Sequence, residues 1–181
     1  MKQKFICGIT VFILFFNVLP LSAQQEYLSG KQFYAEMGGP GLTMSVHFDS
    51  RFRSMERLGL GYRVGIGFTI YPDEAGGTYI NSNYQTRTLY SIPLGINYIF
   101  GKNDSPHTFE IGAGTAVLTR KVEIFSYNEG ERQGHFIGFF TFMYRRAPQN
   151  GGLTWRIGLT PLIGTSGDLY PMASIGFGYA F

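Results

Sequence analysis

The chain has 181 residues, of which 44% are hydrophobic, 17% aromatic and only 15% charged, with a formal net charge of +3. Soluble domains carry about 25% charged residues, and disordered chains are poor in aromatic residues, so this composition is typical of neither class. The mean hydropathy is −0.00, which argues against a bundle of transmembrane helices. A chain that is rich in apolar residues but never concentrates them favours alternating β-strands.

The first residues have the organisation of a secretory signal peptide. Two lysines precede an apolar run over residues 5–19, and Ala23 supplies a small residue for cleavage. An uncleaved anchor helix is the alternative, but it needs about 20 apolar residues, and Asn17 interrupts this shorter run. The sequence therefore predicts a signal peptide over residues 1–23 and one exported domain over residues 24–181.

Removal of the signal peptide changes what the composition supports. The remaining 158 residues have a formal charge of +1 instead of +3, because residues 1–23 contain two lysines and no acidic residue. Cys7 is the only cysteine, and its loss excludes disulfides and thiolate chemistry from the exported domain. A nearly neutral chain without a basic stripe also argues against nucleic acid as a partner.

Apolar residues alternate with small or polar ones along the exported domain, and this period of two predicts β-strands. The clearest segment is 58–70, and in 41–52 the residues Leu42, Met44, Val46 and Phe48 are expected to share the outer face. The phase of the strand near 134–146 stays open, because Phe139 and Phe140 are both apolar. The expected strands are approximately 31–38, 41–52, 58–70, 88–100, 107–119, 134–146, 153–163 and 171–181.

The connections between these strands alternate in length. Those at 53–57, 101–106 and 147–152 are short, whereas those at 71–87 and 120–133 are long and polar. Short turns at the end that holds both termini and long loops at the other are typical of outer-membrane barrels. A soluble sandwich, the alternative, has no reason to sort its connections in this way. We therefore predict an all-β, eight-stranded antiparallel up-and-down transmembrane β-barrel in the outer membrane, with both termini in the periplasm.

Aromatic residues on the predicted outer face gather near both strand ends. Belts of aromatic rings at the headgroup level are typical of membrane barrels, so outer-membrane lipid is the expected partner. The periplasmic group is Phe48, Tyr98, Phe100, Phe109, Tyr144, Trp155, Tyr179 and Phe181, and the outer group is Phe68, Tyr90, Phe136 and Tyr170.

Charged residues on the predicted inner face form a small set of both signs. The lumen of an eight-stranded barrel is just wide enough for side chains to fill. Three carboxylates and three guanidiniums predict a balanced ion-pair network, because an unpaired buried charge would be strongly destabilising. A gated narrow pore or a proton relay is the functional alternative. The six residues are Glu36, Asp49, Arg63, Glu110, Arg145 and Arg156.

The exported chain resembles small eight-stranded outer-membrane barrels of the OmpA/OmpX-like class, and more closely a group of short, largely uncharacterised outer-membrane β-barrel proteins. The strand that stops at Phe181 resembles the C-terminal signal of such proteins, which implies the barrel-assembly machinery as a partner. The resemblance brings no catalytic motif and assigns no role to residues 48–52. The segments that carry it are FYAEMGGPGLTMSVHFDSRF, IPLGINYIFG, FEIGAG, GGLTWRIGLTPLIG and IGFGYAF.

Other chemistry has weak support in the sequence. The GAG segment at 112–114 lacks the following helix and the third glycine of a dinucleotide loop. His47, His107 and His135 fall at separate positions in the predicted barrel and do not compose a metal site, and no cofactor is expected. Some eight-stranded barrels modify lipid A with loop residues. The candidate residues here are Ser126, Glu129, Glu131, His135, Ser166 and Asp168. Their spacing in the sequence gives no support for such a site, because catalytic sites are defined by geometry and not by sequence order.

The expected function is that of a non-enzymatic integral outer-membrane protein with a filled interior and a structural or surface-interaction role. Any surface ligand is expected on the long connections 71–87 and 120–133, because binding concentrates on loops that a rigid scaffold carries. A narrow channel and a lipid A-modifying enzyme are the alternatives.

Overall fold

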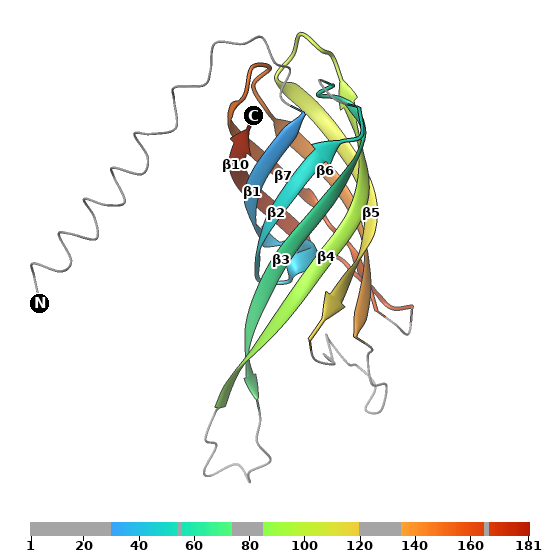
Figure 1. Ribbon diagram of the computed structural model, residues 1–181. Coiled ribbons are helices and arrows are strands. Elements are labelled where there is room, and N and C mark those ends of the chain that lie inside the picture. The colour runs from blue at the N-terminus through green and yellow to red at the C-terminus, as the bar shows by residue number, and fades with distance from the viewer. Residues whose placement is uncertain (1–29, 54–55, 74–84, 120–134, 165–166) are drawn as a thin grey trace, which may run out of the picture.

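The computed structural model describes residues 30–53, 56–73, 85–119, 135–164 and 167–181, which form one antiparallel sheet that closes into a barrel (Figure 1). The predicted signal peptide at 1–23 lies outside these residues. The strands are β1 (Lys31–Gly38), β2 (Met44–Arg51), β3 (Gly59–Asp73), β4 (Gln85–Gly101), β5 (His107–Leu118), β6 (Phe136–Arg146), β7 (Gly152–Leu159), β8 (Leu162–Ile163), β9 (Leu169–Tyr170) and β10 (Ala173–Ala180).

The two shortest strands are continuations of their neighbours. β8 continues the register of β7 against β6, and β9 continues the register of β10 against the extended β7. Pro161 and Pro171 stand at the two interruptions, and proline has no N–H to donate to a ladder. The barrel therefore has eight strands, and the predicted all-β, eight-stranded antiparallel fold is confirmed.

The barrel closes where β1 pairs with β10. Lys31 and Phe181 exchange two backbone hydrogen bonds at this seam, of 3.3 and 2.9 Å. Every other neighbouring pair follows chain order, which makes the topology up-and-down. We call the end of the barrel with Lys31 and Phe181 the termini end, and the opposite end the far end.

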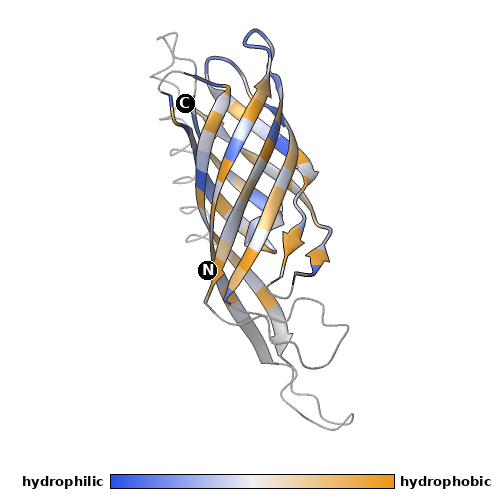
Figure 2. Cartoon of the chain, turned by 90° about the vertical axis from the view of Figure 1, so that its right-hand side faces the viewer, coloured by the Kyte–Doolittle hydropathy of each residue, from blue (hydrophilic) through white to orange (hydrophobic). Residues whose placement is uncertain are grey.

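Side-chain alternation separates an apolar outer wall from the lumen, and hydrophobic stretches recur along the strands (Figure 2). In β3 the residues Leu60 and Ile66 are exposed, whereas Arg63 between them is buried. The structure also determines which side chains of β6 face inward, which the sequence left open. Phe139 is 2% exposed and faces the lumen, whereas Phe140 is 42% exposed and faces outward. Among the described residues no helix is long and apolar enough to cross a membrane.

β3 and β4 extend beyond the rest of the barrel. They stay paired as far as Asp73 and Gln85, whereas β2 leaves β3 at Phe68 and β5 leaves β4 at Ser91. The two strands project from the far end as a ribbon (Figure 1). The predicted connection at 71–87 is thus shortened by a few residues on each side. The rest of it, and residues 120–134 of the second long connection, lie outside the described residues.

The connection from β1 to β2 folds into the barrel. It contains the short helix η1 (Gly39–Gly41), which is buried and touches β3, β4, β5 and β6. Leu42 follows it with a φ of 70°, a conformation that side chains with a Cβ rarely adopt. This backbone turn directs Leu42 inward, so its predicted place on the outer face is wrong.

Leu42 belongs to an apolar cluster in the far half of the lumen. Its other members are Leu89, Leu118, Ile137, Phe139 and Leu162. Tyr170, which was expected on the outer wall, packs against this cluster because it pairs with the buried Leu162 and therefore shares its inward face. The lumen is therefore apolar at the far end. The alternation of outward residues does not reveal which inward residues are apolar and which are polar.

Large side chains in the lumen stand opposite glycines. A Cβ added to any of these glycines would collide with the side chain across the strand pair, so the glycines supply the room that a narrow barrel otherwise lacks. The pairs in register are Arg51 with Gly61, His47 with Gly65, Phe139 with Gly114, Arg156 with Gly176 and Tyr34 with Gly178.

Gly114→Ala tests this steric arrangement. Its methyl group would collide with Phe139 and with the Leu94 carbonyl, and we expect the free energy of unfolding to fall by about 1–3 kcal/mol. Gly138→Ala is the matched control, because a Cβ there meets Ile163 at 3.5 Å, an ordinary contact. Urea unfolding of the refolded barrel, followed by the fluorescence of Trp155, measures both. Equal midpoints for the two variants would contradict the arrangement.

Candidate functional site

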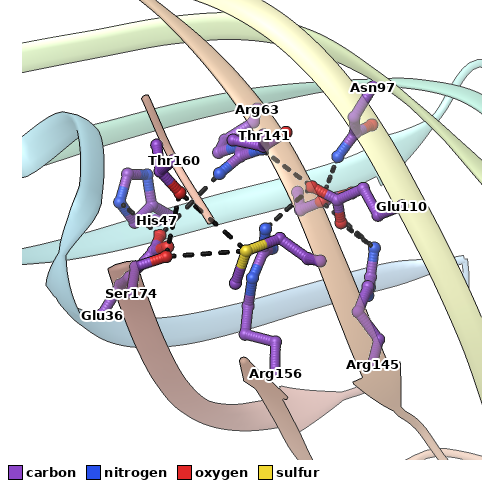
Figure 3. A network of polar contacts seen from close by, with 12 residues as sticks. Glu36, His47, Arg63, Asn97, Glu110, Thr141, Arg145, Arg156, Thr160 and Ser174 are labelled. Atoms are coloured by element: carbon purple, nitrogen blue, oxygen red, sulfur yellow. Dashed lines mark hydrogen bonds and ion pairs between the residues drawn. The ribbon is translucent and has the colours of Figure 1, made fainter. Parts of the chain in front are cut away.

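The centre of the ion-pair network in the lumen is a carboxylate, Glu110 of β5, which three arginines from other strands bind (Figure 3). Arg63 of β3 and Arg156 of β7 each donate through Nη2 to Oε1 at 2.8 Å. Arg145 of β6 donates through Nη1 to Oε2 at 2.7 Å. Because Glu110 and its partners are all buried, these bonds join four strands across the lumen.

A second carboxylate, Asp49, continues the network toward the termini end. Its Oδ1 accepts from Arg51, and its Oδ2 accepts from Asn97 at 2.7 Å. Arg145 Nη1 lies 3.7 Å from Oδ2, which connects Asp49 to Glu110 through one guanidinium. Arg51 also donates to the Asn97 side chain at 2.7 Å and to the Gly59 carbonyl at 2.9 Å.

The third carboxylate, Glu36, lies next to η1 and is held less closely. Its Oε2 is 3.8 Å from Arg63 Nη1 and 3.4 Å from His47 Nε2. Neither oxygen accepts a hydrogen bond from the described residues. The ring of Tyr34 stacks between His47, at a centroid distance of 4.9 Å, and the guanidinium of Arg156, at 4.6 Å.

The structure brings all six predicted charged residues into one network, but the predicted charge balance is wrong. Arg51 is a fourth arginine in the lumen, against three carboxylates among the described residues. A fifth, Arg57, is buried at the termini end and donates to the carbonyls of Ala147 at 2.8 Å and Lys102 at 3.0 Å. The excess of buried positive charge is therefore two.

The position of each missed arginine explains why alternation did not find it. Arg51 has the inward phase of Ser45, His47 and Asp49, but it is the last residue of β2, where the buried Ser50 already departs from the period of two. Arg57 lies in a connection, outside any strand. For Arg51 one signal was available, namely Gly61, which marks the place of a large inward side chain across the strand pair.

Aromatic side chains encircle the termini end on the outer wall. Ring centroids in contact lie 4.9 Å apart for Phe33 and Phe48, 5.9 Å for Phe100 and Phe109, and 5.3 Å for Tyr144 and Trp155. Each of the eight strands supplies a member, so the belt surrounds the barrel. The members are Phe33, Phe48, Tyr62, Tyr98, Phe100, Phe109, Tyr144, Trp155 and Tyr179, with Phe181 stacked on Phe33.

Toward the far end the described aromatic residues on the outer wall are fewer. Phe68 and Tyr90 are exposed and face each other across the pairing of β3 and β4. Phe136 is also exposed there. With Tyr170 turned toward the lumen, these three residues cover only one side of the barrel.

Of the residues that other chemistry would need, those that the structure describes do not meet. His47 is in the lumen, His107 contacts Tyr144 on the outer wall, and His135 Nδ1 is 3.1 Å from the Leu118 carbonyl. Among the described residues no group of three His, Cys, Asp or Glu could hold a metal ion. The GAG segment at 112–114 lies within β5. Ser126, Glu129, Glu131 and Ser166 lie outside the described residues, and Asp168 lies in the turn before β9.

Comparison of the chain with protein-family models, with curated protein sequences and with solved structures gave no match. The function is therefore argued from the geometry of the barrel alone.

Glu110→Gln tests the centre of the network. The substitution leaves three buried guanidiniums without their shared charge, and we expect it to cost about 3–5 kcal/mol of unfolding free energy. Glu56→Gln is the control, because Glu56 pairs with Arg53 at the surface, where such pairs contribute about 0–1 kcal/mol. Urea unfolding followed by Trp155 fluorescence measures both variants. A loss at Glu110 no larger than that at Glu56 would contradict the central role of Glu110.

Proposed function

We propose that this protein is a non-enzymatic integral outer-membrane β-barrel with a filled interior and a structural or surface-interaction role. Both termini face the periplasm, and the two long connections lie outside the cell. The main support for this proposal is an inside-out distribution of residues, in which polar side chains are buried and apolar ones are exposed, together with the aromatic belt at the termini end.

The inside-out distribution supports a lipid environment. Of the described residues, 19 polar or charged residues are buried but only 12 hydrophobic ones, while large apolar side chains on every strand are exposed. Exposed apolar patches larger than a few hundred Å² are rare on soluble monomers and mark contact with lipid or with another protein. An apolar wall on all sides of the barrel favours lipid, because a protein partner would cover only one side.

The aromatic belt supports a defined position in the bilayer. Tyrosine and tryptophan have an apolar ring and a polar group, and they are enriched where the hydrocarbon meets the headgroups. A belt that includes Tyr98, Trp155, Tyr179 and Phe181 would place one membrane interface at the termini end. Phe68 and Tyr90 would mark the other interface, about the height of a transmembrane strand away.

The filling of the lumen supports a role without transport. The ion-pair network occupies the half near the termini end, and η1 with the apolar cluster occupies the far half. At the termini end the described residues enclose a recess of about 10 Å³, about the space of one water molecule. A rigid and closed scaffold leaves the loops at the far end as the place for recognition.

A narrow channel is the second candidate, and one observation favours it. Several buried polar atoms near the middle of the lumen have no hydrogen-bond partner among the described residues, including both Glu36 oxygens, Arg63 Nη1, Arg156 Nη1 and the Tyr34 hydroxyl. Glu36 lies next to η1, since a Cβ on Gly39 would be 3.2 Å from its Oε1. Displacement of η1 would open this polar section toward the far end.

The expected assembly partner is the barrel-assembly machinery. The strand that it would read is β10, whose outward residues Ile175, Phe177 and Tyr179 are exposed and lead to Phe181. This alternation at the end of the chain is the feature that supports the proposal.

Quenching of Trp155 by labelled lipids tests the membrane position. Trp155 is the only tryptophan of the chain, so its fluorescence reports one site. In vesicles we expect stronger quenching by lipids labelled near the headgroup than by lipids brominated deep in the acyl chain. The control is Leu94→Trp in a Trp155→Phe background, which puts the tryptophan on the outer wall midway between Tyr90 and Tyr98 and should reverse the order. Absence of quenching by both lipids at both positions would contradict residence in the bilayer.

Planar-bilayer recordings separate the closed scaffold from the channel. We expect no unitary conductance from the reconstituted full barrel, because the network, η1 and the apolar cluster block the lumen in series. Discrete conductance steps that depend on the protein would favour the channel instead. For a closed barrel, loss of surface adhesion or of envelope integrity after deletion of the gene would then support the structural or surface-interaction role.

A further inference from the structure

A small recess at the termini end is surrounded by positive charge. Its charged lining consists of three arginines, Arg51, Arg57 and Arg145, one carboxylate, Asp49, and the exposed Lys31. The three arginine residues are only 5–6% exposed, so their charges are poorly solvated. They come from β2, from the connection after it and from β6, and the fold brings them to one place.

Asp49 does not neutralise this group. Its two oxygens are already engaged by Arg51 and Asn97, with Arg145 at 3.7 Å. Arg145 makes its shorter contact with Glu110, which two other arginines share. Among the buried groups of the lining, one carboxylate thus faces three guanidiniums, which leaves two uncompensated buried positive charges besides the exposed Lys31.

Arg57 is the least satisfied of the three. Its Nη atoms donate to backbone carbonyls of two neighbouring connections, those of Lys102, Ser105 and Ala147, and none of these acceptors carries a net charge. Its Nε is buried and has no hydrogen-bond partner among the described residues. Burial, and then the nearby charge of Arg145, lower the pKa of the Arg57 guanidinium below its ordinary value. An arginine in this position stays charged, so the repulsion has to be compensated.

The volume of the recess limits what could compensate it. About 10 Å³ accommodates one water-sized particle. Chloride is somewhat larger than a water molecule, but phosphate, sulfate or a carboxylate ligand is larger still, so the recess favours a monatomic anion. Uncompensated buried charges are strongly destabilising, so binding of one anion there would stabilise the folded barrel.

We propose that this recess is a binding site for a single chloride ion, held by Arg51, Arg57 and Arg145. The anion would neutralise the mouth of the lumen and tie the connection that holds Arg57 to the turns at 102–105 and at 147. The site is separate from the lipid-facing wall, and its existence does not depend on the proposed function.

The test compares salts at equal ionic strength. Barrel refolded in an uncharged detergent is unfolded with urea in increasing sodium chloride, with sodium gluconate keeping the ionic strength constant. We expect the unfolding midpoint to rise with chloride and to saturate, and we expect sodium phosphate to give no such rise. Arg57→Gln should raise the half-saturating chloride concentration at least tenfold. Arg53→Gln is the matched control, because Arg53 lies in the same connection with its side chain 82% exposed, and its half-saturation should stay within twofold.

The outcomes decide the proposal in both directions. Equal midpoints in chloride and gluconate would overturn it and leave a water molecule as the occupant. A rise with phosphate but not with chloride would also overturn it, as would a chloride effect that Arg57→Gln leaves unchanged. If Arg57→Gln does not refold, the salt comparison on the unaltered protein still decides. Crystals soaked in bromide give a direct reading, since an anomalous peak between the three guanidiniums is expected, and its absence would contradict the site.

Discussion

Three guanidiniums on one carboxylate hold this barrel together from within. Glu110 reaches Arg63, Arg145 and Arg156, and these contacts join β3, β5, β6 and β7 across a lumen that has little room for solvent. A carboxylate and arginines moved out of water lose several kcal/mol of hydration each, so the network is stable only while its contacts are complete. Asp49 and Glu36 extend it toward the two ends of the barrel, which makes the polar half of the lumen one connected body.

The glycines of the inner wall make room for the large charged and aromatic side chains that fill the lumen. A barrel of eight strands encloses a narrow space, and arginine, histidine, tyrosine and phenylalanine fit there because the facing strand has a glycine in register. The far half is filled differently, by η1 and an apolar cluster that Leu42 enters through a left-handed turn. A polar column and an apolar plug therefore close the same lumen in series, which is the basis for proposing a scaffold rather than a pore.

The outer wall was predictable from the sequence and the ends of the elements were not. An apolar outer wall on a barrel requires apolar residues at every second position of each strand. That period identifies the strands and the inward place of Arg63, Glu110 and Arg156. Where a strand ends or turns, the period stops carrying information. Ser50 is buried at an outward position beside Arg51, Leu42 turns inward after η1, and Arg57 reaches the lumen from a connection. Which of Phe139 and Phe140 faces the lumen could be decided only from the strand pairing, because Gly114 opposite Phe139 supplies the space for its ring.

The coupling between Glu110 and Arg156 tests the central claim most directly. In a double-mutant cycle, Glu110→Gln, Arg156→Gln and the double variant are unfolded with urea, and the interaction energy is the departure from additivity. For a buried pair at 2.8 Å in a shared network we predict a coupling of about 1–3 kcal/mol. The same cycle on the exposed pair Arg53 and Glu56 should give a value near zero. Additive losses at Glu110 and Arg156 would contradict an interior held together by its ion pairs.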